Sequence, residues 1–347
     1  MNFASDNWAG AHPAISEALA QHSTGHASAY GTSELDRQVE QKFSELFERE
    51  VAVFFVSTGT AANALSMALT MKPGGVCFAH EAAHMIADEG GAPEYLSGGG
   101  RLRGVAGGLG RMDPAALEAA IGDYPAQFIH AGQPASVSIT QASEIGTVYD
   151  LEQIEMIGGI AKKHGLPLHM DGARFANALV SLDTTPAEMT WKRGVDILSF
   201  GGTKNGCWCA EAIVVMDPDK AREMPFIRKR SAQLFSKSRF VAAQFAGHFN
   251  DDLWLKTARH ANAMGKRLAD SLASAGTARL AWTPQANEIF LIIAKQKAET
   301  ALQAGARFYP WPVPRGVSCG EDEGLYRFVT SFATSKEDVD AVVNLLA

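Results

Sequence analysis

The sequence predicts an α/β fold with a parallel or mostly parallel sheet, followed by a smaller α+β domain. Short apolar runs that suit buried strands alternate with helical patterns through the first two-thirds of the 347 residues, as in sheets whose parallel strands are joined by helices. The C-terminal part instead combines one long helical pattern with several strand-like runs. We therefore expect a large domain over residues 13–248, a small domain over 249–347 and a separate N-terminal segment over 1–12.

The elements of the large domain follow from the apolar pattern. Leu65, Ala68 and Leu69 recur at helical spacing after the first strand-like run, and Asp150 caps an amphipathic helix. The glycine-rich stretch 97–111 is expected to be a loop, without a dinucleotide-binding GxGxxG between a strand and a helix. The expected strands are the apolar runs at 51–56, 76–79, 126–131, 166–170, 195–200 and 212–217.

The small domain is expected to begin with a long helix from about Asp251 to Ala275. A closing helix starts at Ser335, with Asp338 in the capping-box position where Glu or Gln is more usual. Between these helices lie the strand-like runs 287–293, 306–310 and 325–332.

Composition excludes several classes of function. The net charge of −7 argues against a nucleic-acid partner, because phosphate binding needs a concentrated basic face. Apolar runs fall short of the roughly 20 residues that span a bilayer, and the first residues lack the pattern of a signal peptide. The spacing of the cysteines matches neither a disulfide framework nor a typical zinc hairpin, which predicts a reduced, cytoplasmic compartment; they are Cys77, Cys207, Cys209 and Cys319.

The stretch DILSFGGTKNG, residues 196–206, ends a predicted buried strand at a lone lysine, Lys204. An amine at that point has two interpretations. It is either solvated at a turn, or desolvated and nucleophilic so that it can form a Schiff base with an aldehyde.

Two other predicted strands also end in polar groups. Residues 57–60, Ser-Thr-Gly-Thr, open a helix, where hydroxyls and free N–H groups suit either an anion or an ordinary N-cap. Asp171 follows the run 166–170 and either caps a helix or holds a proton on a heteroaromatic nitrogen. Because parallel strands end at one edge of a sheet, the anion site, the acid and Lys204 are expected to meet there. Together they match an aldehyde cofactor that has a phosphate and a pyridine nitrogen.

These motifs resemble the low-specificity L-threonine aldolases, of the pyridoxal-phosphate fold type I (aspartate aminotransferase-like) superfamily and the beta-eliminating lyases. The resemblance covers nearly the whole chain, through FASDNWAGAHP, SAYGTSELDRQVEQKF, VSTGTAANALSMAL, HEAAHMIADEGGAP, LHMDGARFANAL, SFGGTKNG and LYRFVTSF. It implies a large domain with a mostly parallel seven-stranded sheet and pyridoxal 5′-phosphate as cofactor. It also implies cleavage of L-threonine, L-allo-threonine and related β-hydroxy-α-amino acids to glycine and an aldehyde. Similar proteins are tetramers built from dimers, and we expect the same here.

The resemblance also implies the residues that bind the cofactor. Lys204 would form the Schiff base, and Asp171 would pair with the pyridine nitrogen. Arg174 would lie near the oxygen side of the ring. His84 would stack on the ring and could act in proton transfer, and it is the first candidate for the catalytic base, directly or through a water. The phosphate would be received by Thr58, Gly59 and Thr60.

Substrate residues follow from the same resemblance. Ser5 and Arg327, from opposite ends of the chain, would hold the substrate carboxylate, with Arg174 close by. Tyr30 would reach the active site of a neighbouring subunit. Without the family resemblance, the sequence pattern would predict Arg327 to be a solvent-facing residue of a strand and Tyr30 to be a core residue.

The chain departs from the family pattern at two places. Many relatives carry a second histidine, a candidate for the catalytic base, in an ENTH-like segment. This chain has Thr140, Gln141 and Ser143 there, and His130, slightly upstream, is the residue that could substitute. The basic stretch 228–239 is either a solvated helix face or the source of a side chain that reaches the site of a neighbouring subunit. The sequence leaves open which side chain that would be. Its candidates are Arg228, Lys229, Arg230 and Lys237.

Rival functions stay open at this stage. A beta-eliminating lyase or an aminotransferase on the same fold would use the same lysine, acid and phosphate site. A binding protein has no need of a Schiff-base lysine, and a metal-dependent aldolase is disfavoured because His164 and His169 do not share a helical face. The aromatic residues Phe3, Trp8, Tyr30 and Trp311 belong either to the core or to a pocket for an aromatic substrate such as phenylserine.

Overall fold

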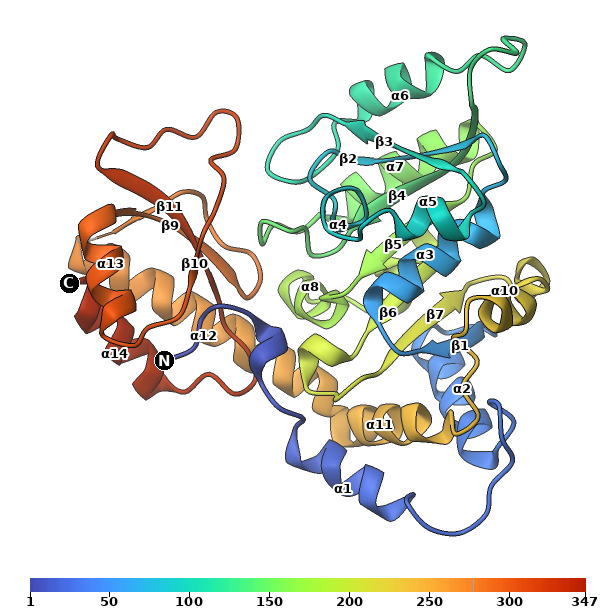
Figure 1. The fold of residues 1–347 in the computed structure, drawn as a ribbon, viewed down its shortest axis with the longest axis horizontal. Helices are drawn as coiled ribbons and strands as arrows, with labels where there is room; N and C mark the ends of the chain where they lie inside the picture. Colours follow the sequence, from blue (N-terminus) through green and yellow to red (C-terminus); the bar gives the residue numbers. More distant parts are fainter. Residues whose placement is uncertain (277) are drawn as a thin grey trace.

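The structure, a computed structural model, describes residues 1–276 and 278–347. Its main feature is a seven-stranded sheet, which confirms the expected α/β class with a mostly parallel sheet (Figure 1). Neighbours are parallel from β6 to β3, while β7 runs antiparallel to both β1 and β6. In order across the sheet, the strands are β1 (Ala52–Val56), β7 (Glu211–Val215), β6 (Val195–Gly201), β5 (Leu168–Gly172), β4 (Gln133–Thr140), β2 (Gly75–His80) and β3 (Arg101–Val105).

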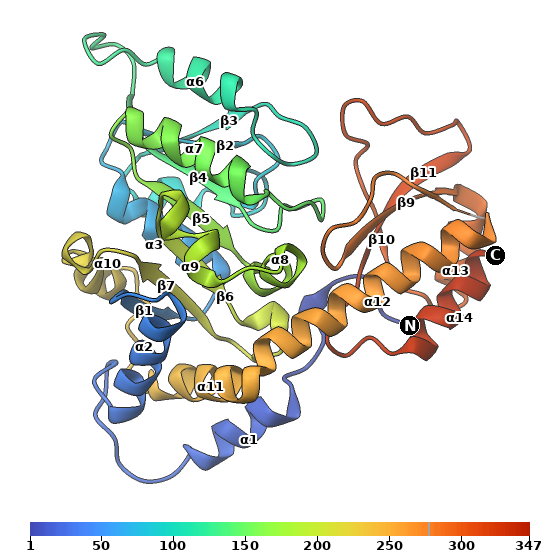
Figure 2. The ribbon, with the colours of Figure 1, turned by 180° about the vertical axis from the view of Figure 1, so that it is seen from behind.

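Helices cover both faces of this sheet. Figure 1 shows α3, α4, α5 and α10 in front of it, and Figure 2 shows α6, α7, α8 and α9 on the opposite face. α1 and α2 pack against α11 near β1. The helices of this part are α1 (Pro13–Gln21), α2 (Glu34–Leu46), α3 (Gly59–Thr70), α4 (His84–Ala87), α5 (Ala92–Leu96), α6 (Pro114–Gly122), α7 (Leu151–Lys163), α8 (Phe175–Leu182), α9 (Pro186–Met189), α10 (Met224–Arg230) and α11 (Arg239–Phe249).

A smaller antiparallel sheet lies beside the large one (Figure 1). It packs on a group of C-terminal helices, and both ends of the chain lie close to these helices. Its strands, in order, are β10 (Tyr309–Pro310), β11 (Glu323–Val329), β9 (Glu288–Ala294) and β8 (Arg279–Leu280). The accompanying helices are α12 (Leu253–Ala275), α13 (Lys295–Gln303) and α14 (Lys336–Leu346). Short 3₁₀ helices complete the chain: η1 (Asp6–Trp8), η2 (Trp191–Arg193), η3 (Thr203–Asn205), η4 (Pro218–Ala221) and η5 (Asn250–Asp252). The domain limits at 12 and 248 stay a prediction.

The N-terminal segment runs between the two sheets. Phe3 is fully buried among the apolar residues of the small sheet, and its N–H and C=O pair with Arg307 and Val329. A few residues later, His12 N–H donates to the carbonyl of Gly206, just past Lys204. The segment thereby connects the small sheet to the turn that carries the lysine.

Buried aromatic rings fix the strand that leads to this turn. The Phe200 ring of β6 lies 5.2 Å from the ring of Phe43 and 5.8 Å from that of Trp254, measured between centroids. Each fully buried ring of this kind contributes about 1.5–3 kcal/mol to the stability of the fold.

Among the helices of the described residues, none has the length and apolar character that a membrane span requires.

One predicted strand is wrong, and β3, β4 and β8 lie outside the predicted runs. Residues 126–131 form a loop in which Phe128 and Ile129 are 52% and 87% exposed, and the strand itself begins at Gln133. β4 buries serines and threonine beside its apolar residues, so its sequence does not form an apolar run. β3, inside the glycine-rich stretch expected to be a loop, is an edge strand with mostly exposed side chains, and such a strand leaves no apolar pattern.

Candidate active site

A cavity of about 260 Å³ lies where β1, β5 and β6 end. It brings together the polar groups that the sequence placed at separate strand ends. The predicted residues that line it are Thr58, Gly59, Thr60, His84, Asp171 and Lys204. Further lining residues, which the sequence analysis did not single out for this role, include Asn7, Asn63, Glu89 and Glu211.

Lys204 reaches the cavity from η3, directly after β6. Gly201 lets the end of β6 lie close to Ala173, the residue that follows β5. A Cβ on Gly201 would lie only 2.6 Å from the carbonyl oxygen of Ala173. Thr203 N–H donates to Glu211 Oε1 over 3.3 Å. Burial raises the pKa of Glu211 to about 7, against the opposing effects of Thr203 and Lys204. The lysine therefore shares its surroundings with a buried carboxyl group that titrates near neutrality.

The N-terminus of α3 is the candidate anion site. The Thr58 hydroxyl accepts a hydrogen bond from Ala61 N–H, and Ala62 N–H donates the first bond within the helix, to Thr58 O. The amides of Gly59 and Thr60 precede that bond, so they are left for an anion at the positive end of the helix dipole.

Asp171 is the acid at the end of β5, and it is 3% exposed. Its Oδ1 accepts from Ala173 N–H over 3.0 Å, and its Oδ2 accepts from Asn63 Nδ2 over 2.9 Å. The second proton of the Asn63 amide goes to Glu89 Oε1, 2.8 Å away. The carboxylate is therefore fixed in orientation by groups from two elements of the fold.

The same network reaches His84. Glu89 Oε1 lies 2.9 Å from His84 Nδ1. This hydrogen bond is the main cause that raises the pKa of His84 above its usual value. A continuous chain of side chains thus joins Asp171 to His84 through Asn63 and Glu89.

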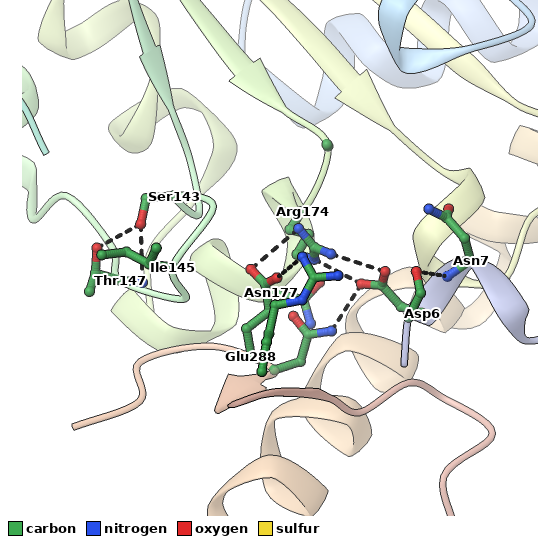
Figure 3. A network of polar contacts seen from close by, with 12 residues as sticks. Asp6, Asn7, Ser143, Ile145, Thr147, Arg174, Asn177 and Glu288 are labelled. Carbon is green, nitrogen blue, oxygen red and sulfur yellow. Dashed lines mark hydrogen bonds and ion pairs between the residues drawn. The ribbon is translucent and has the colours of Figure 1, made fainter. Parts of the chain in front are cut away.

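Arg174, buried beside the cavity, is held between two carboxylates (Figure 3). Its Nε and Nη2 donate to Asp6 over 2.8 and 3.0 Å, and its Nη1 lies 3.3 Å from Glu288 Oε2. Burial alone would raise the pKa of Asp6, but Arg174, followed by Lys204, holds it below the usual value. Arg174 therefore anchors the N-terminal segment through Asp6, an acid that the sequence analysis did not identify.

Arg327 lies on the other side of Glu288. Its Nη1 is 3.7 Å from Glu288 Oε1, and its guanidinium lies 4.5 Å from the centre of the Trp311 ring. Burial raises the pKa of Glu288 to about 7, although both arginines oppose this shift. Ser5 accepts from Asn7 N–H over 3.1 Å and so positions a residue of the cavity wall. The predicted carboxylate-binding residues, Ser5, Arg174 and Arg327, do not line the cavity.

Several candidate residues lie away from the cavity. Tyr30 is 51% exposed and has the left-handed φ of 60°. His130 precedes β4, at the opposite edge of the sheet from the cavity, and packs against Phe128. The positions where relatives carry the second histidine motif are buried. Thr140 is the last residue of β4, Gln141 Nε2 donates to the carbonyl of Tyr149, and Ser143 Oγ is hydrogen-bonded to Thr147 Oγ1.

The basic stretch is divided between structural and exposed roles. Arg228 is buried, donates to the carbonyl of Phe55 and lies over the Phe54 ring. Lys229 Nζ lies 5.5 Å from the centre of the Tyr30 ring. Gln233, which follows α10, accepts from the N–H and the hydroxyl of Ser57, at the entrance to the anion site.

Comparison with known proteins agrees with this geometry. Residues 2–296 match the beta-eliminating lyase family. The chain is 39% identical over 337 residues to a low specificity L-threonine aldolase of Pseudomonas aeruginosa, covering 97% of this chain and 94% of that protein. A second low specificity L-threonine aldolase, from a Pseudomonas species, is 39% identical over 88% of both chains. The solved structure of a Leishmania major threonine aldolase is similar with a TM-score of 0.91 and 28% identity, covering 99% and 98% of the two chains.

Proposed function

This chain belongs to the beta-eliminating lyase family, with the low-specificity L-threonine aldolases as relatives, and on that premise we propose that it is an aldehyde-lyase. It cleaves L-threonine, L-allo-threonine and related β-hydroxy-α-amino acids to glycine and an aldehyde. The observation that carries the proposal is the presence of Lys204, Asp171 and the N-terminus of α3 in one cavity.

Pyridoxal 5′-phosphate, the cofactor of this family, fits the chemistry of the cavity. Its aldehyde, pyridine nitrogen and phosphate require an amine, a carboxylate and an anion site. Lys204, Asp171 and the amides of Gly59 and Thr60 supply these groups. When bound, the cofactor supplies an electron sink that weakens the bonds to the substrate Cα.

Asp171 and His84 divide the proton chemistry. Asp171 would hold a proton on the pyridine nitrogen, with its oxygens kept in place by Asn63 and Ala173. When His84 donates from Nδ1 to Glu89, its Nε2 is the atom that can take the proton of the substrate β-hydroxyl. Removal of that proton allows the Cα–Cβ bond to break, and the aldehyde leaves.

The carboxylate of the substrate would bind to Arg327, with Ser5 and Arg174 as neighbours. Two observations support this placement. Arg327 Nη2 lies 3.5 Å from the carbonyl of Ala4, beside Ser5, and the Arg327 guanidinium is held between Glu288 and the Trp311 ring. A planar guanidinium in a fixed position suits a carboxylate, because it can donate two parallel hydrogen bonds.

The assembly and location complete the proposal. Tyr30 and Lys229 form an exposed cation–π pair, which would suit the expected contact with a neighbouring active site in a tetramer of two dimers. Light scattering of the purified protein would measure the number of subunits, and a monomer would contradict the proposed tetramer.

The cysteines of the described residues are free thiols, in keeping with a cytoplasmic enzyme.

The alternative functions use the same cofactor-binding residues, so products must separate them. The purified protein is incubated with L-threonine, and acetaldehyde, glycine, ammonia and 2-oxo acids are measured together. Acetaldehyde and glycine in equal amounts support the aldolase. Ammonia with a 2-oxo acid would indicate a beta-eliminating lyase, and a 2-oxo acid formed only with an amino acceptor would indicate an aminotransferase.

A further inference from the structure

Glu211 is the first residue of β7, and it lies between the strand ends that lead to the candidate anion site and to the lysine. In the sheet it is paired with Val56, the last residue of β1, and with Gly201, the last residue of β6. Residues 57–60 continue from β1, and Lys204 lies just past β6. Glu211 is 5% exposed and lines the same cavity as these residues. A buried acid therefore lies beside the proposed site of a phosphate group.

The surroundings of Glu211 offer little compensation for a negative charge. In the part of the chain that the structure describes, the hydrogen bonds to its carboxylate come from Thr203, whose N–H donates to Oε1 over 3.3 Å. No lysine or arginine of these residues forms an ion pair with it, whereas Asp6 and Glu288, beside the same cavity, both lie against Arg174. A carboxylate at this position is therefore unusually exposed to the charge of a bound anion.

The cation that acts on Glu211 is Lys204, which opposes the effect of burial on the pKa of the carboxyl group. The nitrogen of Lys204 is assigned to the cofactor aldehyde, so it is no longer a free ammonium group once the Schiff base has formed. The compensation that Lys204 offers in the empty cavity is then altered at the moment when the phosphate arrives.

The other ionisable groups around Glu211 supply no positive charge. Burial, helped by Asp171 across the cavity, brings the pKa of Glu211 to about 7 before an anion is bound. Cys207 and Cys209 precede β7, and burial raises the pKa of both thiols, so they stay neutral near pH 7. The neighbouring elements β1 and α3 carry no ionisable side chains.

We propose that Glu211 takes up one proton from solvent when the phosphate of the cofactor enters the cavity, so that the loaded protein holds it as a neutral carboxylic acid. A phosphate group near neutral pH carries about 1.5–2 negative charges, and a nearby like charge favours the protonated form of a carboxyl group. The protonated acid has an O–H that can donate to an anion, whereas the carboxylate can only accept. The inference rests on the proposed binding of pyridoxal phosphate, and it adds a proton to that binding.

The test follows the binding of pyridoxal phosphate to the cofactor-free chain by calorimetry. Measurements at pH 8.5 in two buffers with different enthalpies of ionisation give the number of protons taken up on binding. Glu211→Gln keeps an acceptor for Thr203 N–H but has no carboxylate to protonate. The control is Glu152→Gln, at an exposed position of α7.

We expect the wild type and Glu152→Gln to take up close to one proton more than Glu211→Gln. Because binding favours the protonated acid, the affinity of the wild type should fall relative to that of Glu211→Gln by about tenfold between pH 7 and pH 8.5. At pH 6 the two should bind with similar affinity, since Glu211 is already mostly protonated there. Equal proton uptake, or a ratio of affinities that does not change with pH, would overturn the inference.

Inorganic phosphate separates this inference from the proposed function, because it has no aldehyde and forms no bond with Lys204. At pH 8.5 it should bind the cofactor-free Glu211→Gln chain more tightly than the wild type, and the difference should vanish at pH 6. If pyridoxal phosphate fails to react with Lys204, the proposed function fails, while inorganic phosphate still tests Glu211. Equal affinity of the two chains for inorganic phosphate at pH 8.5 would refute the role of Glu211 alone.

Discussion

Glu89 Oε1 lies 2.9 Å from Nδ1 of His84, and this contact ties the histidine of the active site to a buried acid. The Glu89 carboxylate has no exposed side-chain surface, whereas His84 is partly open to the cavity. The pair therefore fixes the ring and favours its protonated form. Because the proposed base must be neutral to accept a proton, we expect the same contact to set the lower pH limit of the reaction.

The first prediction concerns this limit. Glu89→Gln removes the negative charge that raises the pKa of His84, so the acidic limb of the kcat/KM profile should move to lower pH. The maximal rate should also fall, because the ring is held less firmly. The pH profile with L-threonine measures both effects, with exposed Glu152→Gln as the control. An acidic limb at the wild-type position would show that Glu89 does not act through His84.

A second prediction concerns Glu211. Its pKa of about 7 lies above the unfolded value of 4.5, so its contribution to stability is complete below pH 4.5 and is lost as the pH rises through 7. Glu211→Gln keeps an acceptor for Thr203 N–H and removes the buried charge. The variant should therefore be more stable than the wild type at pH 8, by up to ~3 kcal/mol, and similar at pH 5.

Urea unfolding of the cofactor-free protein at both pH values measures this difference. In the cofactor-free protein the Lys204 amine is free, so its effect on Glu211 is the same in all samples. A variant that is less stable than the wild type at pH 8 would mean that the Glu211 charge is compensated in the folded protein.

The third prediction concerns the N-terminal segment. Asp6→Asn weakens the buried pair with Arg174, where both side chains are almost fully buried, and such losses cost about 3–5 kcal/mol. The matched control is Asp219→Asn, which breaks a 2.8 Å pair with Arg222 on the surface and should cost less than about 1 kcal/mol. Denaturant unfolding of the two variants should show this contrast. Equal losses would argue that the segment contributes little through Asp6.

The sequence located much of the site because strand ends share an edge. Lys204, Asp171 and residues 58–60 each lie at or just past the end of a buried strand, so a mostly parallel sheet brings them together without further information. The residues that hold them in place were not predicted. Asn63 and Glu89 lie within helical or loop sequence where an amide and an acid are common, and only the packing of α3 beside α4 and α5 makes them meet.

Contacts between residues far apart in the sequence could not be predicted for the same reason. Asp6 meets Arg174 across 168 positions, and Glu288 reaches both Arg174 and Arg327 from the small sheet. Nothing in the local pattern around these acids indicates such partners. The fold errors, at 126–131 and in β3, arose where burial and apolar character differ: an exposed apolar loop and an edge strand with polar side chains.

The central claim is that Lys204 binds pyridoxal phosphate and that the loaded chain cleaves L-threonine. The most direct measurement is the visible absorption spectrum of the purified protein before and after addition of L-threonine, with acetaldehyde assayed in the same cuvette. The claim predicts a band from the lysine-bound cofactor in the wild type, its loss in Lys204→Ala, and release of acetaldehyde with glycine by the wild type alone. An unchanged band in Lys204→Ala, or a band in the wild type without aldehyde from either L-threonine or L-phenylserine, would contradict it.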